Sequence, residues 1–509
     1  MESLERRALM SAVPGTLDTT GFGAPNGYVS ANYWTSALSA GATAALELPN
    51  GGIVVGGAAQ FKTNEFALVS YNSDGSLNKS FGTNGTVATV ITSEKSQQPV
   101  GVGDSIDSLF YQTNGDIVAV GLSYVFYPLN AKNNNWTSTD QFVTLAEYKP
   151  NGTLDTSFGT GGISQTLIVA DSGVYATQVK ISAALQPSGD IVVGLGRSGA
   201  IYKAVSELVR FTPSGALDTT FGSAGTGFEQ LAPLTRAPQI AVEPDGSILV
   251  DAAQSGNYIA HYLPNGTFDT TFGDLAVNAT SIALEPGSGG ALNLVLAMPG
   301  NPGELERYDL STPDGGAQTA TLDTTFGVDG VATLPTGYSI STGGGAGAVA
   351  VEPQLGGDII VQGSGNGGVA PIAFTASGAI DTSYGPAGNG IGSAMLISGG
   401  SSIEDVSGQT GYGDLLIAGS LNDDFAVARY LAPTTVTNMA TAGSASAGSI
   451  AEAVMARRSS ASKPLAGPMA AGDRLVAAGA WASSLSGLDQ FFGDYGDRTG
   501  LDLLLKIER

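Results

Sequence analysis

One short phrase recurs along the chain and limits the possible folds more than any other feature of the sequence. It reads Leu-Asp-Thr-Thr/Ser-Phe-Gly at 154–159, 217–222 and 322–327, with variants at 17–23, 77–82, 268–273 and 380–385. Its acidic or amide residues lie 51 to 77 positions apart, at Asp18, Asn78, Asp155, Asp218, Asp269, Asp323 and Asp381. Seven copies at this spacing predict a chain built from seven similar units.

Between the phrases, short apolar runs alternate with turn residues. Runs such as 53–56 and 191–194 follow turns rich in Asn, Asp, Ser and Gly, and a further run follows the phrase, as at 162–168. Runs rich in Val, Ile and aromatic residues between such turns are typical of antiparallel strands joined by hairpins. Four strands in each of seven units predict an all-β fold, a seven-bladed β-propeller of four-stranded antiparallel blades.

The composition excludes several classes of function. With 45 acidic and 21 basic residues among 509, the net charge of −24 repels nucleic acids and anionic membranes. The absence of cysteine and the presence of one histidine exclude disulfides, thiol nucleophiles and ordinary zinc sites. Because no run of 18 apolar residues occurs, we expect no membrane-spanning helix.

The seven phrases resemble the delta-60 repeat, which forms tandem β-propeller arrays in bacterial proteins. The resemblance covers residues 13 to 433, and it implies a secreted or cell-surface protein of bacterial origin without implying any catalytic residue. The segment 4–12 is similar to the LEPR-XLL segment that precedes many bacterial extracellular repeat proteins, with Arg6 in place of the proline. That similarity implies export, although residues 1–12 lack the apolar core of a secretory signal.

The sequence predicts four parts. Residues 1–12 form an N-terminal export-type segment, 13–433 the propeller, 434–466 a linker rich in Ala, Ser and Thr, and 467–509 a partly helical C-terminal tail.

The order of the phrases predicts how the ring closes. The chain begins with a phrase and ends its last unit without one, so we expect Leu17 and Phe22 to dock against that unit and close the ring.

The phrase itself is interpreted as a structural turn. Asp and the Thr or Ser hydroxyl can bond nearby amides, Phe can be buried between blades, and Gly can adopt positive φ. A turn that forms the fold must recur in every blade, whereas a catalytic residue need not.

The sequence offers little for catalysis or for metal binding. His261, the only imidazole, stands where other units have Arg210, Arg307 and Arg429, which disfavours a Ser/His/Asp triad. Oxygen ligands compatible with calcium are plentiful, but no calcium-loop motif occurs, so no cofactor is expected and calcium alone is left open. The alternative to a binding function is a carbohydrate-active hydrolase or lyase that uses acidic residues of the propeller channel.

An insertion in the second unit suggests where a ligand would bind. Insertions in repeat proteins gather on one face, often the binding face, and aromatic side chains next to Asn suit sugars. The candidate residues are Tyr124, Phe126, Tyr127, Asn133, Asn134, Asn135 and Trp136. We therefore predict a monomeric, non-catalytic extracellular or cell-surface module that binds glycan or protein or acts as a scaffold.

Overall fold

The computed structural model describes one part of the chain. It covers residues 13–431 except 32–33, 35–36, 38, 62–63, 92–103, 131–134, 171–177, 199–204, 232–237, 253–257, 273–274, 278, 288–290, 312–316, 341–350, 354–357, 366–367, 395–402, 410–413 and 422–423. The chain divides into two units, residues 1–446 and 447–509, and every described residue belongs to the first. The predictions for the export-type segment, the linker and the helical tail therefore concern residues outside the described ranges.

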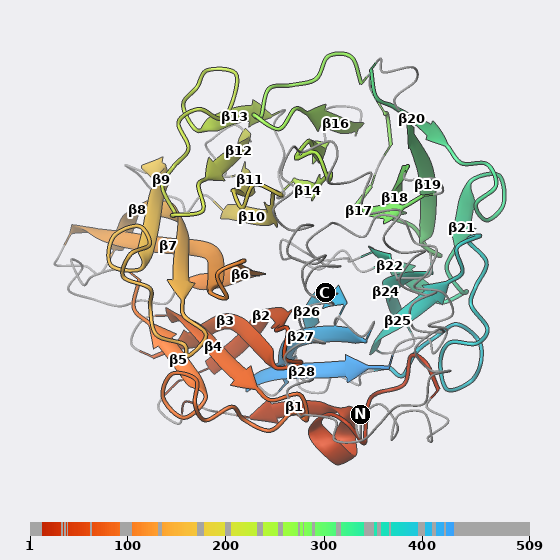
Figure 1. Cartoon of the computed structure of the whole chain (residues 1–509), viewed down its shortest axis with the longest axis horizontal. Helices are drawn as coiled ribbons and strands as arrows, with labels where there is room; N and C mark the ends of the chain where they lie inside the picture. The colour runs from red at the N-terminus through yellow and green to blue at the C-terminus, as the bar shows by residue number, and fades with distance from the viewer. Residues whose placement is uncertain are drawn as a thin grey trace, which may run out of the picture. The chain divides into compact units, whose positions relative to one another are not determined.

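Seven antiparallel sheets stand around a common axis, which confirms the predicted seven-bladed β-propeller (Figure 1). Blades 1 to 3 comprise β2 to β5 (Ser39–Glu47, Ile53–Gln60, Asn64–Tyr71, Thr86–Thr89), β6 to β9 (Ser105–Tyr111, Ile117–Asn130, Asn135–Tyr148, Ile163–Ala170) and β10 to β13 (Gln178–Leu185, Ile191–Ser198, Val205–Phe211, Phe228–Leu231). Blades 4 and 5 comprise β14 to β16 (Gln239–Val242, Ile248–Ala252, Tyr258–Tyr262) and β17 to β21 (Ser281–Pro286, Leu292–Met298, Glu304–Ser311, Thr319–Leu322, Val331–Thr333). Blade 6 comprises β22 to β25 (Tyr338–Ile340, Val351–Pro353, Ile359–Gly365, Gly368–Phe374), and blade 7 comprises β26 to β28 (Ile403–Gln409, Leu415–Leu421, Asp424–Tyr430) with β1 (Tyr28–Ala31). The first strand of each blade lies nearest the axis, where β2 contacts both β6 and β26.

The recurring phrase lies between the third and the fourth strand of a blade. In blade 2, for example, residues 154–159 connect β8 to β9, and Leu154 forms a bridge with Tyr148 at the end of β8. Each unit that runs from one phrase to the next therefore supplies the last strand of one blade and the first three strands of the following blade.

The N-terminal phrase closes the ring as the sequence suggests. Leu17 forms a bridge with Tyr430, and β1 pairs antiparallel with β28 from Tyr28 opposite Ala428 to Ala31 opposite Phe425. The first described residues thus supply the outer strand of the last blade.

Blade 4 departs from the four-strand pattern. Its sheet contains three strands among the residues that the structure describes, and the outer position holds one bridge, from Leu275 to Ile259 of β16. The other blades carry a regular fourth strand, or in blade 6 a bridge between Ile372 and Ile391.

Aromatic residues of the phrases fill the seams between blades. Six are at most 1% exposed: Phe22, Phe81, Phe158, Phe221, Phe326 and Tyr384. Each packs beneath a turn glycine of the neighbouring blade, as Phe158 does under Gly215, so apolar burial is continuous around the ring.

Backbone hydrogen bonds join the blades at the same places. The phrase glycine donates its N–H to a turn carbonyl of the next blade at six seams, with distances of 2.7 to 3.0 Å. The pairs are Gly23 with Asp74, Gly82 with Asn151, Gly159 with Ser214, Gly222 with Asn265, Gly327 with Ser377 and Gly385 with Pro14.

Helix is nearly absent from the described residues. The single helical element there is a five-residue π-turn, Gly23–Gly27. Among the residues that the structure describes, no helix is long and apolar enough to cross a membrane.

Candidate functional site

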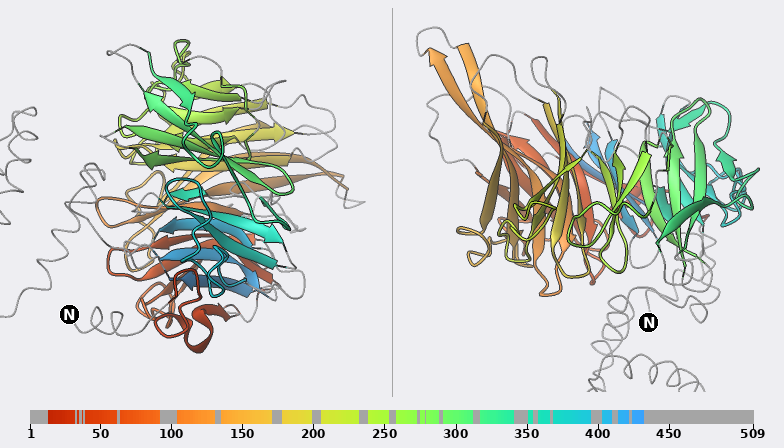
Figure 2. Two further views of the ribbon diagram at one scale, coloured as in Figure 1. Left: turned by 90° about the vertical axis from the view of Figure 1, so that its right-hand side faces the viewer. Right: turned by 90° about the horizontal axis from the view of Figure 1, so that it is seen from above.

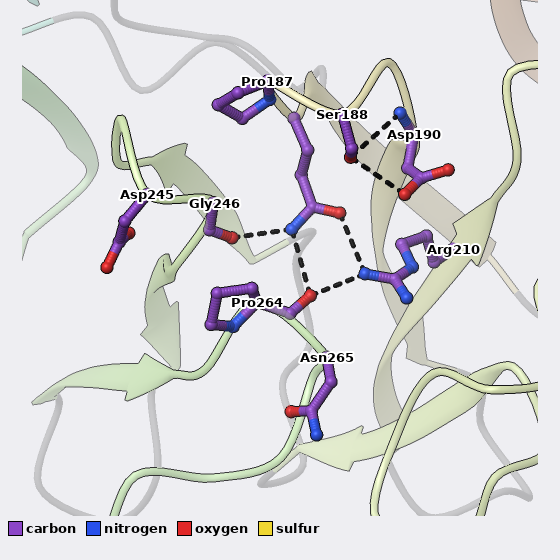
Figure 3. Close-up of a pocket in the computed structure, with 9 residues that line it drawn as sticks. Pro187, Ser188, Asp190, Arg210, Asp245, Gly246, Pro264 and Asn265 are labelled. Carbon is purple, nitrogen blue, oxygen red and sulfur yellow. Dashed lines mark hydrogen bonds between the residues drawn. The ribbon is translucent and has the colours of Figure 1, made fainter. Parts of the chain in front are cut away.

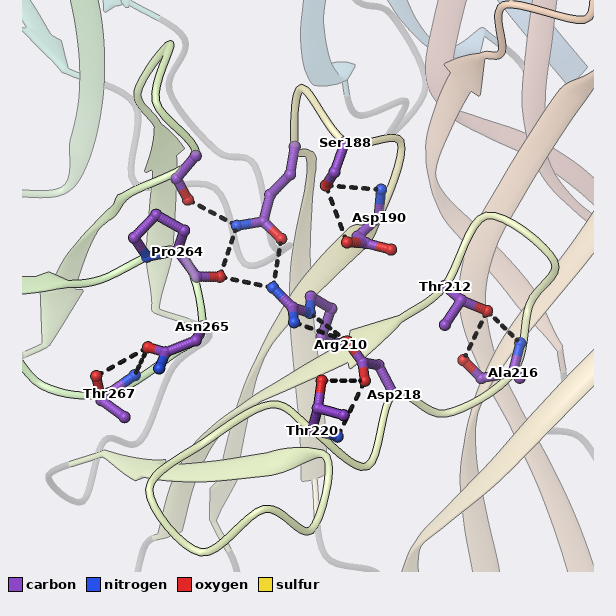
Figure 4. Close-up of polar contacts among 12 residues, drawn as sticks. Ser188, Asp190, Arg210, Thr212, Ala216, Asp218, Thr220, Pro264, Asn265 and Thr267 are labelled. Atoms are coloured by element: carbon purple, nitrogen blue, oxygen red, sulfur yellow. Dashed lines mark hydrogen bonds and ion pairs between the residues drawn. The ribbon is translucent and has the colours of Figure 1, made fainter.

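The carboxylate of the phrase closes a local turn in most blades. In blade 3, Oδ1 of Asp218 accepts the backbone N–H of Thr220 at 3.0 Å and its hydroxyl at 2.7 Å (Figure 4). The same pair of bonds occurs at Asn78, Asp155, Asp269, Asp323 and Asp381, each with the Ser or Thr two positions later. Asp18 instead bonds the N–H of Gly21 at 2.7 Å, because one residue is inserted there. These oxygens are committed to the fold.

In blades 3, 4, 5 and 7 the second carboxylate oxygen contacts a residue on the third strand, at what we call the clamp position. It precedes the aromatic residue at the end of that strand, and its carbonyl accepts the N–H of the phrase residue in all seven blades. The clamp residues are Ser70, Glu147, Arg210, His261, Arg307, Ala373 and Arg429.

Three clamp arginines form buried ion pairs that also reach the next blade. In the described contacts, Arg210 pairs with Asp218 at 2.7 Å and donates to the carbonyl of Pro264 in blade 4. Arg307 pairs with Asp323 and reaches Ala376 of blade 6; Arg429 pairs with Asp18 and reaches Ser73 of blade 1. Each guanidinium also lies 4.6 to 4.9 Å from the phrase phenylalanine ring, which adds a cation–π contact. These arginines are therefore part of the framework.

A pocket opens at the seam between blades 3 and 4, with a volume of about 300 Å³ (Figure 3). Gln186 and Arg210 are among the residues that line it, and both are buried. The amide nitrogen of Gln186 donates to the carbonyls of Gly246 and Pro264, and its oxygen accepts from Arg210. Since these polar groups satisfy one another, a ligand would meet mainly the rim, where Asp190 and Asp245 add negative charge.

Blade 2 reverses the charge at the clamp position. Ligand atoms of Glu147, Asp116 and Asp155 all lie within 4.8 Å of one another, and Lys149 pairs with Asp155 at 2.9 Å. Burial, followed by repulsion from Asp116 and Asp155, raises the pKa of Glu147 to about 7. Bonds from Ser157 and Lys149 lower the pKa of Asp155 to about 2.

This carboxylate group is the place where the described residues offer three oxygen ligands to a cation. The donor set suits a hard ion such as calcium. Lys149 already supplies one positive charge, and the proton that Glu147 retains near neutral pH reduces the negative charge further. A cation would therefore compete with Lys149 and with this proton for the same oxygens.

The clamp position of blade 4 holds His261, which is 4% exposed. Its Nδ1 lies 2.9 Å from Oδ2 of Asp269, and its Nε2 lies 2.9 Å from Oε2 of Glu243. The imidazole therefore bridges two carboxylates at the position where the clamp arginines form their ion pairs. The sequence comparison of His261 with Arg210, Arg307 and Arg429 finds this position, but it does not find Glu243.

The predicted ligand residues lie on or beside a long hairpin. Strands β7 and β8 have 14 residues each, against eight in β3 and β4, and the hairpin projects beyond the other blades (Figure 2). Backbone pairing places Tyr127 opposite Ser138 and Pro128 opposite Trp136. Asn133 and Asn134 fall outside the described residues, as do the side chains of Phe126, Tyr127, Asn135 and Trp136.

Tyr124 is the one predicted ligand residue whose surroundings are described. It is half-buried, and its N–H donates to Oδ1 of Asp104 at 3.4 Å. Burial, then the charges of Asp107 and Asp104, raise the pKa of its phenol above the usual value. The hairpin therefore leaves the body of blade 2 beside two carboxylates.

Comparison with known proteins agrees with the fold. Residues 48–81 and 243–272 match the family model described as "Domain of unknown function (DUF5122) beta-propeller". The chain is a propeller repeat protein. No curated protein matches it.

Solved structures are similar to this chain only at a coarse level. A polysaccharide lyase described as PL25 ulvan lyase has 10% identity and a TM-score of 0.39, covering 79% of this chain and 96% of its own. The Hadza microbial sialidase Hz136 has 11% identity and a TM-score of 0.34, covering 65% and 64%. The extracellular domains 1–2 of Drosophila Semaphorin 1a have 8% identity and a TM-score of 0.30, covering 66% and 86%.

Proposed function

We propose that this propeller is a non-catalytic binding or scaffold module whose contact surface includes the β7–β8 hairpin. The observation that carries the proposal is the length of this hairpin, which extends one blade well beyond its neighbours (Figure 2). The repeat turns and the clamp arginines are engaged in holding the ring, so the insertion is the part of the fold that the ring does not need.

The ligand class follows from the residues that the hairpin carries. Aromatic rings next to asparagine amides suit the apolar faces and hydroxyls of a sugar, and also the surface of a protein. We propose an extracellular glycan or surface protein as the partner, and a monomeric protein that binds no nucleic acid.

The location follows from the resemblance to delta-60 repeats and to the LEPR-XLL segment. On that basis we propose a bacterial protein that is secreted or displayed at the cell surface. Fractionation of the native host, with detection of the full chain, tests this part separately.

The test of binding is a broad glycan array probed with the full chain, with and without a calcium chelator. We expect selective binding that Trp136→Ala abolishes and that Val328→Ala, at a residue 77% exposed in blade 5, leaves unchanged. Loss of binding with the chelator would add calcium to the proposal.

Two results would contradict glycan binding by the hairpin. A blank array would leave a surface protein as the partner, and equal binding by both variants would place the site elsewhere. Turnover of a polysaccharide by the wild-type chain would favour the enzyme alternative.

A further inference from the structure

His261 performs in blade 4 the task that arginine performs in blades 3, 5 and 7. It lies on β16 opposite Leu249 of β15, and its ring stacks on Phe272 at 5.0 Å. The charged groups that face the imidazole are Glu243, directly after β14, and Asp269 of the phrase. Blade 5 contributes Gln318, whose amide donates to the other oxygen of Glu243 at 2.7 Å.

The two carboxylates lie on opposite sides of the imidazole ring, and the protonation state of the ring decides whether it can bond both of them. A neutral imidazole carries one N–H and can donate to only one of them, whereas the imidazolium donates to both. Arginine keeps its charge at every physiological pH, but histidine does not. Blade 4 therefore holds the one clamp cation among the described residues that can be discharged near neutral pH.

We propose that His261 makes blade 4 a pH-responsive joint of the ring, which is tightened when the imidazolium bridges Glu243 and Asp269 and loosened when it releases a proton to solvent. After that release, one ring nitrogen presents a lone pair to a carboxylate, and the two repel. If the contact with Glu243 breaks, the side chain that carries the bond from Gln318 loses its anchor, so the loosening reaches the contact with blade 5.

The direction of the effect follows from the contacts. Burial alone would lower the pKa of His261, but the bonds and charges of Glu243 and Asp269 outweigh burial and raise it. A raised pKa in the folded state means that the stabilisation is complete below the unfolded value of 6.5 and is lost as the pH rises through the folded value. The joint therefore loosens on the alkaline side.

Among the described residues, the outer edge of blade 4 has few backbone contacts besides this clamp. In the described part of this blade, one bridge from Leu275 to Ile259 stands where blades 1, 2 and 3 have a regular strand. Because regions with few backbone bonds open at low free energy, the loss of one clamp contact should be visible there first.

The experiment uses the full chain, purified without a histidine tag, because His261 is then its only imidazole. Titration of a ¹³C-labelled histidine by NMR should give a midpoint above 6.5. Hydrogen exchange between pH 6 and 8.5, corrected for intrinsic rates, should show at least a tenfold loss of protection in 258–272. The matching segment around Arg307, 304–311, should change by less than threefold.

Three variants separate this joint from other causes. His261→Arg should remove the pH dependence of protection in blade 4. If that variant does not fold, Glu243→Gln serves instead, since an amide can bond a neutral imidazole and should flatten the same profile. Glu147→Gln should keep the profile of blade 4, because Glu147 titrates in blade 2. A midpoint at or below 6.5, or an equal loss of protection in 258–272 and in 304–311, would overturn the proposal.

Discussion

At the scale of single residues, the group that pairs with the phrase residue differs from blade to blade. The phrase carboxylate is pulled into the seam by its turn, and a charge there needs a partner. Arginine at the clamp position supplies it in blades 3, 5 and 7 and histidine in blade 4, whereas in blade 2 the cation is Lys149, two residues after the clamp. Blade 1 pairs Asn78 with Ser70 and needs no charge. Blade 6 has Ala373 at the clamp position, and there Asp381 is bonded by Ser383 of its own turn.

Substitution of Arg429 tests how much a buried clamp ion pair contributes to the stability of the fold. It is 3% exposed and pairs with Asp18 at 2.6 Å, so Arg429→Met leaves a buried carboxylate without a cationic partner. We expect a loss of about 3–5 kcal/mol in the free energy of unfolding, measured by urea denaturation at pH 7.

The matched control is Arg197→Met. Arg197 pairs with Glu207, and both side chains are at least 20% exposed, so the expected loss is about 1 kcal/mol. Equal losses in the free energy of unfolding for the two variants would mean that burial does not determine how much a clamp ion pair stabilises the fold.

The raised pKa of Glu147 predicts a second pH dependence of the stability of the fold. Its folded pKa of about 7 exceeds the usual 4.5, so the folded state binds a proton that the unfolded state releases, and stability falls as the pH rises from about 4.5 to about 7. Glu147→Gln removes this loss. Thermal unfolding should therefore show a higher midpoint for the variant than for the wild type at pH 8, and similar midpoints at pH 4.5. A variant that is less stable at pH 8 would show that the carboxylate is stabilising there.

At the scale of elements, the hairpin turn and the phrase act as one joint across each seam. Gly378, in the turn after β25, has φ +78°, and a Cβ there would lie 2.5 Å from the nitrogen of Gly327 and 2.9 Å from the ring of Phe326. The turn must lack a side chain for the N–H of Gly327 to reach Ser377.

A pair of glycine variants separates backbone strain from this close approach. Gly161 also has positive φ, +66°, but a Cβ there meets nothing within 4 Å. We expect Gly161→Ala to cost about 1 kcal/mol and Gly378→Ala about 2–4 kcal/mol, because the second adds a clash across the seam. Chemical denaturation measures both, and equal costs would show that the seam yields to a methyl group.

The local bonds of the phrase can be predicted from the sequence, whereas the partners that come from other parts of the blade cannot. The phrase at Asp155 or Asp218 gives the number of blades and the turn, because its bonds are local. The partners Asp116 and Glu243 lie directly beside the ends of other strands of the blade, Asp116 before β7 and Glu243 after β14, and only the pairing of these strands brings them to Glu147 and His261. An alignment of the third strands already shows Glu147 where other blades have arginine, but it does not show the two acids beside it.

At the scale of the whole molecule, the ring depends on a contact between its ends. Deletion of residues 1–31 removes β1, takes Asp18 away from Arg429 and exposes the seam that Phe22 fills, so we expect a marked fall in the thermal unfolding midpoint. Deletion of residues 1–12 removes none of these contacts and should leave the midpoint unchanged. A stable ring after the longer deletion would show that closure is dispensable.

Because each sequence repeat spans parts of two blades, duplication or loss of a repeat changes the number of blades in a ring of this kind. A segment from one phrase to the next, such as 154–216, carries the last strand of one blade and the first three of another. An in-frame duplication of that segment therefore inserts one whole blade while leaving the terminal pairing of β1 with β28 intact. Unequal recombination between copies of the phrase can thus lengthen or shorten the circle in single steps, and each product still carries matching ends.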